Sequence, residues 1–547
     1  MRTSAIPISA ESTIEGDGTQ KLDARVIDTP EVTTVSWLDL NGLIALAVVL
    51  AAGVLRFWQL GNRGLWYDEL VTVNLTSNGP LSAVAQTITS DMHPPLFAVL
   101  QSLAMPLLGN SEWAVRALPA FMGMLTAAVI YLVGKKMLGA KVGLWAAALF
   151  AVAPIALHYG QEARPYSQLM LASSLLLLAF VALVEKPTTR RTVLLGIALT
   201  GLAYTHVYGV FAAPLVLMAV LVLPRLRKRL GRRVLLSYLI AIVAFLPWAK
   251  VILDQVKVLS QNTSQGSWWL QAPVGESPFV TVYNNLLAFA PRVTADMGAI
   301  FVLLAAIGVV GYVVVRRQPR PNESFSSPSG VQESDFVWLL LSFALVPIIA
   351  GLVLSKEVAP IYHVRYTLVS LPAVYLLVAA GGVRLPWRAG KLALAVLLAV
   401  GIAGLPAYYN DSLGKGEWRA ATRYVMSNSD NGTAMLVDGI TGIDIDSYGR
   451  ILGRKEGFGS IMVLPNPSDE TSVTGATWKG TWVPVNLDGY IGEHDRVLAA
   501  LEDSRNPFFA YMDKKEGWQP TGTWNRPDTA TIRTWERVAG RATTVTP

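Results

Sequence analysis

The stretch that decides the fold covers residues 40–69 and reads LNGLIALAVVLAAGVLRFWQLGNRGLWYDE. Its first part is a continuous apolar run of the length that a helix needs to cross a bilayer, which is about 20 residues. The run is followed by Trp66 and Tyr67, residue types that favour the membrane–water interface, and then by two adjacent acids, Asp68 and Glu69. The stretch therefore predicts a membrane span near residues 40–58 and an acid pair placed where the chain leaves the bilayer.

Composition extends this prediction to most of the chain. The 547 residues are 52% hydrophobic and only 15% charged, whereas soluble proteins carry about 25% charged residues. Apolar runs of span length recur along the first three quarters of the chain, which indicates an α-helical polytopic membrane protein with about eleven transmembrane helices. We expect these spans near residues 40–58, 113–133, 141–157, 167–184, 192–206, 208–224, 234–249, 297–315, 336–354, 366–382 and 391–408.

Basic residues predict the orientation of the spans. The formal charge of +7 is concentrated in short loops such as GKKMLGAK, EKPTTRR, RLRKRLGRR, RRQPRP and RLPWRAGK, each of which follows an even-numbered span. Because basic loops remain in the cytoplasm, this pattern predicts a cytoplasmic amino terminus and an extracytoplasmic carboxyl terminus, and it argues against a nucleic-acid partner. Residues 1–38 are polar, without a visible cleavable signal peptide, and we expect a disordered cytoplasmic tail.

The carboxyl-terminal quarter has a different composition. Residues 410–547 lack an apolar run of span length and combine alternating stretches such as TAMLVD with helix-like ones such as DRVLAALED. We expect an extracytoplasmic mixed α/β domain there, after a transmembrane catalytic domain at 39–409. No glycine pattern for nucleotide binding and no metal-finger spacing occurs in it. The chain has no cysteine, which excludes disulfides and thiolate chemistry.

The acid pair allows two interpretations. Consecutive side chains point in different directions, so Asp68 and Glu69 do not form the facing carboxylates of a glycoside hydrolase. One acid is expected to act as a single base, with reduced hydration raising its pKa, while the other holds the loop or binds substrate. The alternative is an interfacial aromatic belt followed by a helix amino terminus.

The other polar residues of the predicted outer loops also have two interpretations each. His93 precedes two prolines and is either part of a plain loop or a neighbour of Asp68. Arg164, in the segment HYGQEARPY, either holds a phosphate or pairs with Glu162. Arg365, in YHVRY, either extends to lipid headgroups or binds a lipid-linked phosphate through its planar fork.

Together, an acid, histidines and arginines on one face of a many-span protein suit one type of reaction. A sugar on a polyprenyl phosphate is an activated donor, whose phosphate leaves C1 as positive charge builds on the ring. The acceptor hydroxyl needs a base, a role for Asp68, and the departing phosphate needs cations, a role for Arg164 and Arg365.

These motifs resemble a known family. WYDE in the first outer loop, HPPL after it, RALPA at the second span, GQEARPYS at a later turn and YHVRYTLVSLPA at a late span occur in order across residues 40–410. In this respect the chain is similar to the GT-C glycosyltransferases, in the branch of the protein O-mannosyltransferases and the aminoarabinose transferases that modify lipid A. The tail start GEWRAATRYV resembles extracytoplasmic extensions of bacterial, often actinobacterial, members.

The resemblance implies an inverting transferase that uses a polyprenyl-monophosphate sugar of mannose or arabinose type. Asp68 matches the catalytic aspartate of the family, with Glu69 beside it. Substrate-binding positions are expected at Tyr67, His93, Arg164, Tyr166, His363 and Arg365. Expected acceptors are an envelope glycan, a glycolipid or a protein. No cofactor and no metal are expected, because relatives with monophosphate donors generally need none and no metal-ligand spacing occurs.

Two other classes of protein remain as alternatives. A polytopic lipid or glycolipid transporter, or flippase, would show inverted internal repeats and charges near the middle of its spans. A non-catalytic scaffold would work through its tail domain and would leave the acid pair of the first outer loop unexplained.

Overall fold

The computed structural model describes most of the chain from Leu40 to Val538. The described residues are 40–261 without 92, 331–410 without 358–361 and 386–387, 417–454 without 431, 461–464, 475–478, 481–484, and 487–538 without 503, 527 and 528. All of them belong to one compact unit that begins at Leu40. The predicted tail at 1–38 and the predicted span at 297–315 lie outside the described residues.

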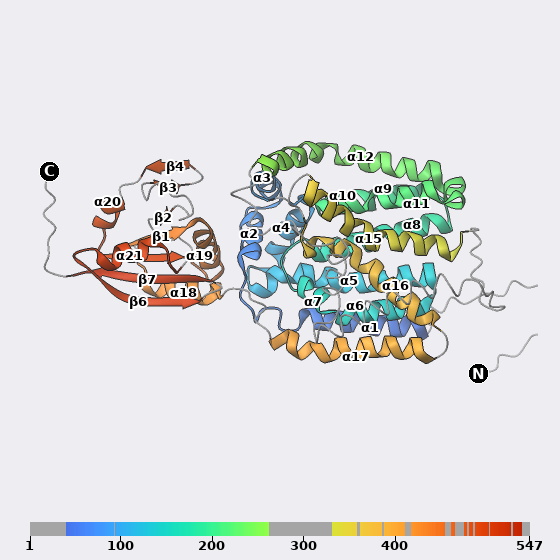
Figure 1. Cartoon of the computed structure of the whole chain (residues 1–547), viewed down its shortest axis with the longest axis horizontal. Coiled ribbons are helices and arrows are strands. Elements are labelled where there is room, and N and C mark those ends of the chain that lie inside the picture. Colours follow the sequence, from blue (N-terminus) through green and yellow to red (C-terminus); the bar gives the residue numbers. More distant parts are fainter. Residues whose placement is uncertain are drawn as a thin grey trace, which may run out of the picture. The chain divides into compact units, whose positions relative to one another are not determined.

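Long apolar helices make up the first part of the described chain (Figure 1). Seven helices in it are long and apolar enough to cross a membrane, or eight if a bent pair counts as one span. They are α1 (Leu40–Phe57), α5 (Glu112–Leu138), α8 (Tyr166–Glu185), α12 (Pro224–Gln261), α15 (Glu333–Glu357), the 3-10 helix η1 (Val364–Ser370) continued by α16 (Leu371–Arg384), and α17 (Arg388–Asn410). The bent pair is α6 (Ala140–Val152) and α7 (Pro154–Gly160), which meet at 65°. This confirms the predicted polytopic helical fold, whereas the count of about eleven spans stays a prediction.

Two predicted spans form shorter helices. The apolar stretch expected at 192–206 is α9 (Thr189–Ala203), and the one expected at 208–224 is divided into α10 (Val207–Ala212) and α11 (Pro214–Val222). Pro214 sits in the first turn of α11, where its missing N–H costs no hydrogen bond.

Short helices connect the long ones at one end of the bundle. They are α2 (Tyr67–Thr76), α3 (Pro80–Ser90), α4 (Leu96–Leu108) and α7. Contacts between distant segments show that these connections meet: the Leu96 N–H donates to the Tyr204 carbonyl, and the Ala163 N–H donates to the Glu69 carboxylate. The loops that carry the predicted site residues therefore lie on the same side of the bundle.

Small residues bring α5 and α6 into close contact. A Cβ atom at Gly134 would lie 2.5 Å from the Cα of Gly143, and one at Gly143 would lie 2.4 Å from the Tyr131 carbonyl oxygen. Helix pairs in membranes depend on such close backbone approach, because the lipid tails are as apolar as the side chains and add no hydrophobic drive.

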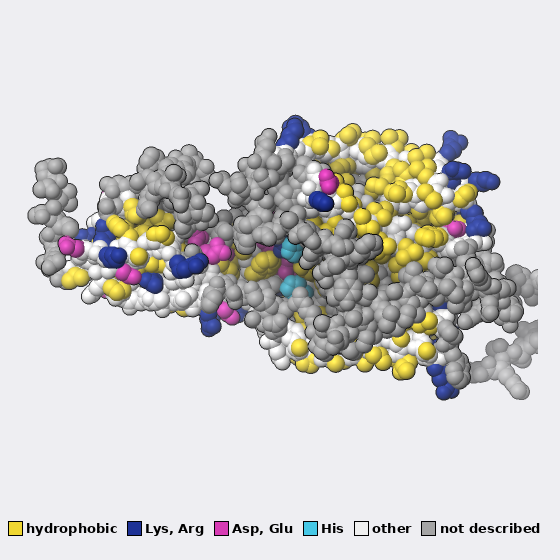
Figure 2. Space-filling model, viewed as in Figure 1, with side chains coloured by type: hydrophobic (Ala, Val, Ile, Leu, Met, Phe, Trp, Pro, Cys, Tyr) yellow, Lys and Arg dark blue, Asp and Glu magenta, His cyan; other side chains and the backbone are white. Residues whose placement is uncertain are grey.

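The outside of the bundle is apolar over a broad area. Figure 2 shows hydrophobic side chains spread over the helical part of the chain, with lysine and arginine gathered toward the ends of the helices. On α12, Leu239 is 57% exposed and Leu246 is 60% exposed. An exposed apolar surface of this extent suits contact with lipid rather than with water.

The last part of the chain folds around a mixed sheet. Five strands lie in the order β2 (Ile461–Leu464), β1 (Thr433–Asp438), β5 (Arg496–Leu501), β7 (Ala530–Arg537) and β6 (Trp518–Arg526). The first three strands pair in parallel, and β7 is antiparallel to both of its neighbours. Helices α18 (Trp418–Asn428), α19 (Gly439–Ile451), α20 (Leu487–Gly492) and α21 (Pro507–Lys514) accompany the sheet, and β3 (Gly475–Trp478) pairs with β4 (Thr481–Pro484). This confirms the expected mixed α/β fold near the carboxyl end.

Substituting Gly134 by alanine is expected to weaken the α5–α6 crossing, at a cost of about 1–3 kcal/mol, because the added methyl group forces the two backbones apart. The matched control is Gly231→Ala in α12, where an added Cβ meets nothing within 4 Å; it is expected to stabilise the helix by about 1 kcal/mol. Thermal unfolding of both variants in detergent measures the difference. Equal midpoints for the two variants would contradict the close packing of α5 on α6.

Candidate active site

The predicted acid pair lies in the first turn of α2. Trp66 precedes the helix, and the Glu69 Oε2 atom accepts a hydrogen bond from the Trp66 N–H at 3.3 Å, which closes the turn. Asp68 and Glu69 both stand where the positive end of the helix dipole stabilises negative charge. Their side chains point to different partners, as their adjacency in the sequence predicts.

Glu69 is fully buried and bound by Arg116 of α5. The guanidinium of Arg116 donates from Nε to Oε1 at 2.7 Å and from Nη2 to Oε2 at 2.6 Å. It also donates to the carbonyls of Leu60, Arg63 and Gly64, so all five of its N–H groups have acceptors. The Ala163 N–H adds a further hydrogen bond to Oε1 at 3.0 Å. Glu69 thus joins the loop before α2, the start of α5 and the turn before α8.

Asp68 has a different environment, in which its carboxylate is partly buried and forms an ion pair with Arg365. Its Oδ2 atom lies 3.1 Å from Nη1 of Arg365, with side-chain exposures of 16% and 14%. Burial raises the pKa of the Asp68 carboxyl, and the guanidiniums of Arg164 and Arg365 only partly offset that rise. A carboxylate with a raised pKa and an exchangeable partner is suited to accept a proton.

Arg164 provides a second cation beside Asp68. Its Nη1 atom lies 3.5 Å from Asp91 Oδ2 and 3.3 Å from the Thr72 hydroxyl, and its Nε atom has no hydrogen-bond acceptor in the part of the chain that the structure describes. Arg164 is only 7% exposed. A buried guanidinium with an unused donor next to a second arginine is an arrangement that can receive an anion such as a phosphate.

Aromatic rings form the wall next to the two arginines. The rings of His93 and His206 lie 4.5 Å apart, and the ring of Tyr366 lies 4.9 Å from that of His206. The Arg365 guanidinium lies over Tyr166 and Tyr366, at 5.8 Å and 5.5 Å from their ring centroids. Cation–π contacts with these two rings favour this position of the Arg365 guanidinium next to Asp68.

Both predicted loop histidines are uncharged at neutral pH. Burial lowers the pKa of His93 well below the usual value, and Arg164 and Arg365 lower it further. Burial also lowers the pKa of His363, to about 4, again with a contribution from Arg365. The neutral His363 accepts a hydrogen bond at Nδ1 from the Arg365 N–H at 3.2 Å, and so caps η1. His363 therefore positions the arginine that pairs with Asp68.

The structure brings the predicted site residues together, although they come from segments far apart in the chain. Tyr67, Asp68, His93, Arg164, Tyr166, His363 and Arg365 all border the same region. Sequence reasoning missed Arg116, Asp91, His206 and Tyr366 as members of this region. Arg116 opens the quoted RALPA motif and His206 is one of the five histidines of the chain, but neither pattern indicates a partner.

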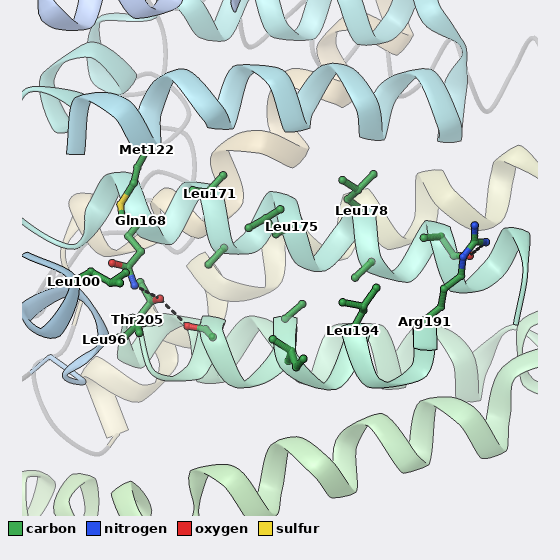
Figure 3. Close-up of a pocket in the computed structure, with 16 residues that line it drawn as sticks. Leu96, Leu100, Met122, Gln168, Leu171, Leu175, Leu178, Arg191, Leu194 and Thr205 are labelled. Atoms are coloured by element: carbon green, nitrogen blue, oxygen red, sulfur yellow. Dashed lines mark hydrogen bonds between the residues drawn. The ribbon is translucent and has the colours of Figure 1, made fainter. Parts of the chain in front are cut away.

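An apolar groove opens next to this polar cluster (Figure 3). It has a volume of about 570 Å³ and lies between α8 and α9, with contributions from α4 and α5. At one end the Gln168 amide donates to the Thr205 hydroxyl at 2.9 Å, and at the other end lies Arg191. Leu175 and Leu194, between these ends, are 41% and 45% exposed, so the groove is open toward the outside of the bundle. Gln168 is two residues from Tyr166 and Thr205 adjoins His206, which places the polar end beside the aromatic wall.

The described residues of the site do not form a recognisable metal-binding group. Within the described residues, no group of three or more His, Asp or Glu side chains is arranged to hold a metal ion. The predicted absence of a metal and of a cofactor stays a prediction.

Removing either member of the Glu69–Arg116 pair is expected to destabilise the protein by about 3–5 kcal/mol, because a buried charge is left without its partner. Replacing both, as in the double variant Glu69→Leu, Arg116→Leu, is expected to cost less than either single change. The control is the Lys136–Glu185 pair, at 2.7 Å with both side chains 37% exposed, where Lys136→Ala is expected to cost less than about 1 kcal/mol. Thermal unfolding measures all four variants; single variants as stable as the control would exclude the structural role of Glu69.

Comparison with known proteins supports the fold. The family described as dolichyl-phosphate-mannose-protein mannosyltransferase matches residues 92–250, whereas no curated protein matches the chain. ArnT from Cupriavidus metallidurans, solved with bound undecaprenyl phosphate, is similar with a TM-score of 0.59 at 12% identity, over 92% of this chain and 99% of ArnT. The archaeal oligosaccharyltransferase AglB from Archaeoglobus fulgidus, solved with an inhibitory peptide and a dolichol-phosphate, has a TM-score of 0.51 at 13% identity, over 93% of this chain and 75% of AglB. The resemblance drawn from the motifs is thereby confirmed: the chain has the fold of the GT-C glycosyltransferase superfamily.

Proposed function

We propose that this protein is a membrane glycosyltransferase that moves a sugar of mannose or arabinose type from a polyprenyl-monophosphate donor to an envelope glycan, glycolipid or protein. The observation that carries the proposal is the ion pair of Asp68 with Arg365, with Arg164 as a second nearby cation and an apolar groove on the neighbouring helices α8 and α9. The groove matches a polyprenyl chain, the arginines match its phosphate, and the carboxylate matches the base that the acceptor hydroxyl requires.

The donor is recognised by both of its parts. An isoprenoid tail placed in the groove between α8 and α9 buries apolar surface along Leu171, Leu175 and Leu178. Its phosphate then lies at the end marked by Gln168, within reach of Arg164 and Arg365. ArnT and AglB were solved with polyprenyl phosphates of this kind, undecaprenyl phosphate and dolichol-phosphate, which supports the same class of lipid here.

Transfer is a direct displacement at the sugar C1. Asp68 takes the proton of the acceptor hydroxyl, the acceptor oxygen forms a bond to C1, and the bond from C1 to the phosphate oxygen breaks. The polyprenyl phosphate leaves with the electron pair, and Arg164 and Arg365 stabilise its charge. One attack from the face opposite the leaving group inverts the configuration at C1.

Before the donor binds, the ion pair with Arg365 lowers the basicity of Asp68. Arg365 pairs with Asp68 at 3.1 Å, and an arriving phosphate competes for the same guanidinium. Once Arg365 turns to the phosphate, the carboxylate loses an ion pair that lowers its pKa, and its basicity increases. Donor binding and activation of the base are therefore coupled.

The site is proposed to face the outside of the cell, with the amino terminus in the cytoplasm and the mixed α/β domain extracytoplasmic. Basic side chains such as Lys136, Arg191 and Arg229 lie at the end of the bundle away from Asp68, around Glu185. Basic residues favour the cytoplasmic side of a membrane, which supports this orientation.

Asp68→Asn is expected to lower transfer by about 10²–10⁴-fold, because the amide cannot take up the acceptor proton. The assay uses the purified protein with radiolabelled polyprenyl-phosphate mannose or arabinose and envelope acceptors, and unfolding midpoints confirm that each variant is folded. Asp495→Asn is the matched control, since Asp495 is 97% exposed on the carboxyl-terminal domain. Undiminished transfer by Asp68→Asn would move the base elsewhere, and movement of lipid by a wild type that transfers no sugar would favour a flippase.

Leu175→Trp is expected to raise the KM for a long-chain polyprenyl donor about tenfold while leaving the KM for a short-chain analogue unchanged, because the indole fills the middle of the groove. Leu246→Trp on the outside of α12 is the control, since Leu246 is 60% exposed and does not line the groove. Steady-state kinetics with donors of two chain lengths measure the difference. An equal change for both lengths would place the tail elsewhere.

A further inference from the structure

A buried polar face of α19 has no role in the reaction described above. Asp444 is 0% exposed, and neither of its carboxylate oxygens has a hydrogen-bond partner among the described residues. Thr441, one turn earlier, is also 0% exposed, and its hydroxyl likewise lacks a partner there. A buried carboxyl group without hydrogen-bond partners is costly, and a bound ligand with hydroxyl groups would remove that cost.

This face of α19 is directed at the loop that carries Asp68. Tyr448 lies four residues after Asp444, on the same side of the helix. Its hydroxyl accepts a hydrogen bond from the Leu65 N–H at 3.0 Å and donates to Glu112 Oε1 at 2.8 Å. Ile445 and Tyr448 also share a buried cluster with Leu65 and Leu70. Asp444 therefore lies one helical turn from Tyr448, whose hydrogen bonds hold α19 against the loop before α2.

Electrostatic effects agree with this placement. Burial, together with the negative charges of Asp438, Asp68 and Glu502, raises the pKa of Asp444 to about 8. Burial raises the pKa of Tyr67, and Asp444 contributes to that rise. The Asp444 carboxyl group is therefore close enough to Tyr67 and Asp68, the two residues that begin α2, to interact with them electrostatically.

We infer that Asp444 is an acceptor-binding residue, through which the carboxyl-terminal domain binds two neighbouring hydroxyls of a neutral carbohydrate acceptor and presents one of them to Asp68. The inference rests on the proposed function and names its acceptor class. Hydroxyl groups supply the hydrogen-bond donors that the carboxyl oxygens lack.

The surrounding charges favour a neutral carbohydrate over other acceptors. Asp68, Asp438 and Glu502 add negative charge around Asp444, which opposes an anionic acceptor. Asp438 is already occupied, because its oxygens accept hydrogen bonds from the Thr441 N–H and the Glu502 N–H. Two unused oxygens on one carboxyl group match the two hydroxyls of a vicinal diol, whereas the side chain of a serine or threonine acceptor offers a single one.

The test compares Asp444→Asn and Asp444→Leu with wild type, using the full chain in lipid nanodiscs. Octyl mannoside and octyl arabinofuranoside serve as neutral acceptors, octyl glucuronide as the anionic one, and a serine-containing peptide as the protein-like one. The matched control is Asp446→Asn, on the same helix, where Asp446 is partly exposed and pairs with Arg450.

We expect both Asp444 variants to raise the KM for the neutral glycosides about tenfold or more. A change of this size corresponds to the loss of one good hydrogen bond to a carboxyl group. The KM for the donor is expected to stay unchanged, and Asp446→Asn to match wild type. We also expect the unfolding midpoint of Asp444→Leu to rise, since the unpartnered carboxyl is gone. A higher midpoint with an unchanged acceptor KM, or preferred use of the peptide or of the glucuronide, would overturn the inference.

Binding separates this inference from the proposed function. Saturation-transfer NMR with the same neutral glycosides needs no sugar transfer. Loss of their binding in Asp444→Leu but not in Asp446→Asn would support the acceptor subsite even if no donor were consumed. Equal binding by wild type and Asp444→Leu would overturn the subsite even if Asp68→Asn abolished transfer.

Discussion

The buried ion pair between Arg116 and Glu69 is the interaction on which the polar end of the bundle depends. One guanidinium joins α5 to the loop at residues 60–64 and to the first turn of α2, and the carboxylate extends the link to the turn before α8. Charges this far from water are tolerated only when nearly every donor and acceptor is used. Because this condition is met, the hydrogen bonds of Arg116 and Glu69 hold the loop and the first turn of α2, which carries Asp68, against α5.

Adjacent acids with unlike environments give the site its chemical character. Glu69 has two strong hydrogen bonds from one arginine and no exposure, whereas Asp68 is partly exposed and, among the residues that the structure describes, pairs with Arg365. A saturated carboxylate is a structural element, while an exchangeable one with a raised pKa is able to take up a proton. Asp68 and Glu69 are adjacent in the sequence but have different roles, because a helix directs consecutive side chains to different neighbours.

In the proposed function, donor and acceptor reach Asp68 from opposite directions. The donor lipid lies in the apolar groove between α8 and α9 and places its phosphate at the arginines. The acceptor enters from the side of the carboxyl-terminal domain, where α19 packs near the start of α2 through Tyr448 and the buried cluster around Leu65. This arrangement assigns the tail domain a part in catalysis, and it explains why a polar helix face is buried against the membrane domain.

The membrane class, the mixed domain at the carboxyl end and the segments that carry the site could all be predicted from the sequence. These features depend on local patterns: an apolar run of span length predicts a helix in lipid wherever it occurs, and alternation predicts strands. The motif order was also sufficient to predict the GT-C fold. The pattern was weakest at 192–224, where three short helices replace two predicted spans, because the second span is divided before Pro214, which begins α11.

The sequence did not predict which side chains face one another; the folded structure shows these pairs. Asp68 and its partner Arg365 are 297 positions apart, and Glu69 and Arg116 are 47 positions apart. Hydropathy contains no information on such pairings, because they depend on how the helices pack and on which buried charge finds a donor within reach. The same reason explains the groove, the contact between the rings of His93 and His206 and the place of Asp444: each is formed by segments that meet only in the folded protein.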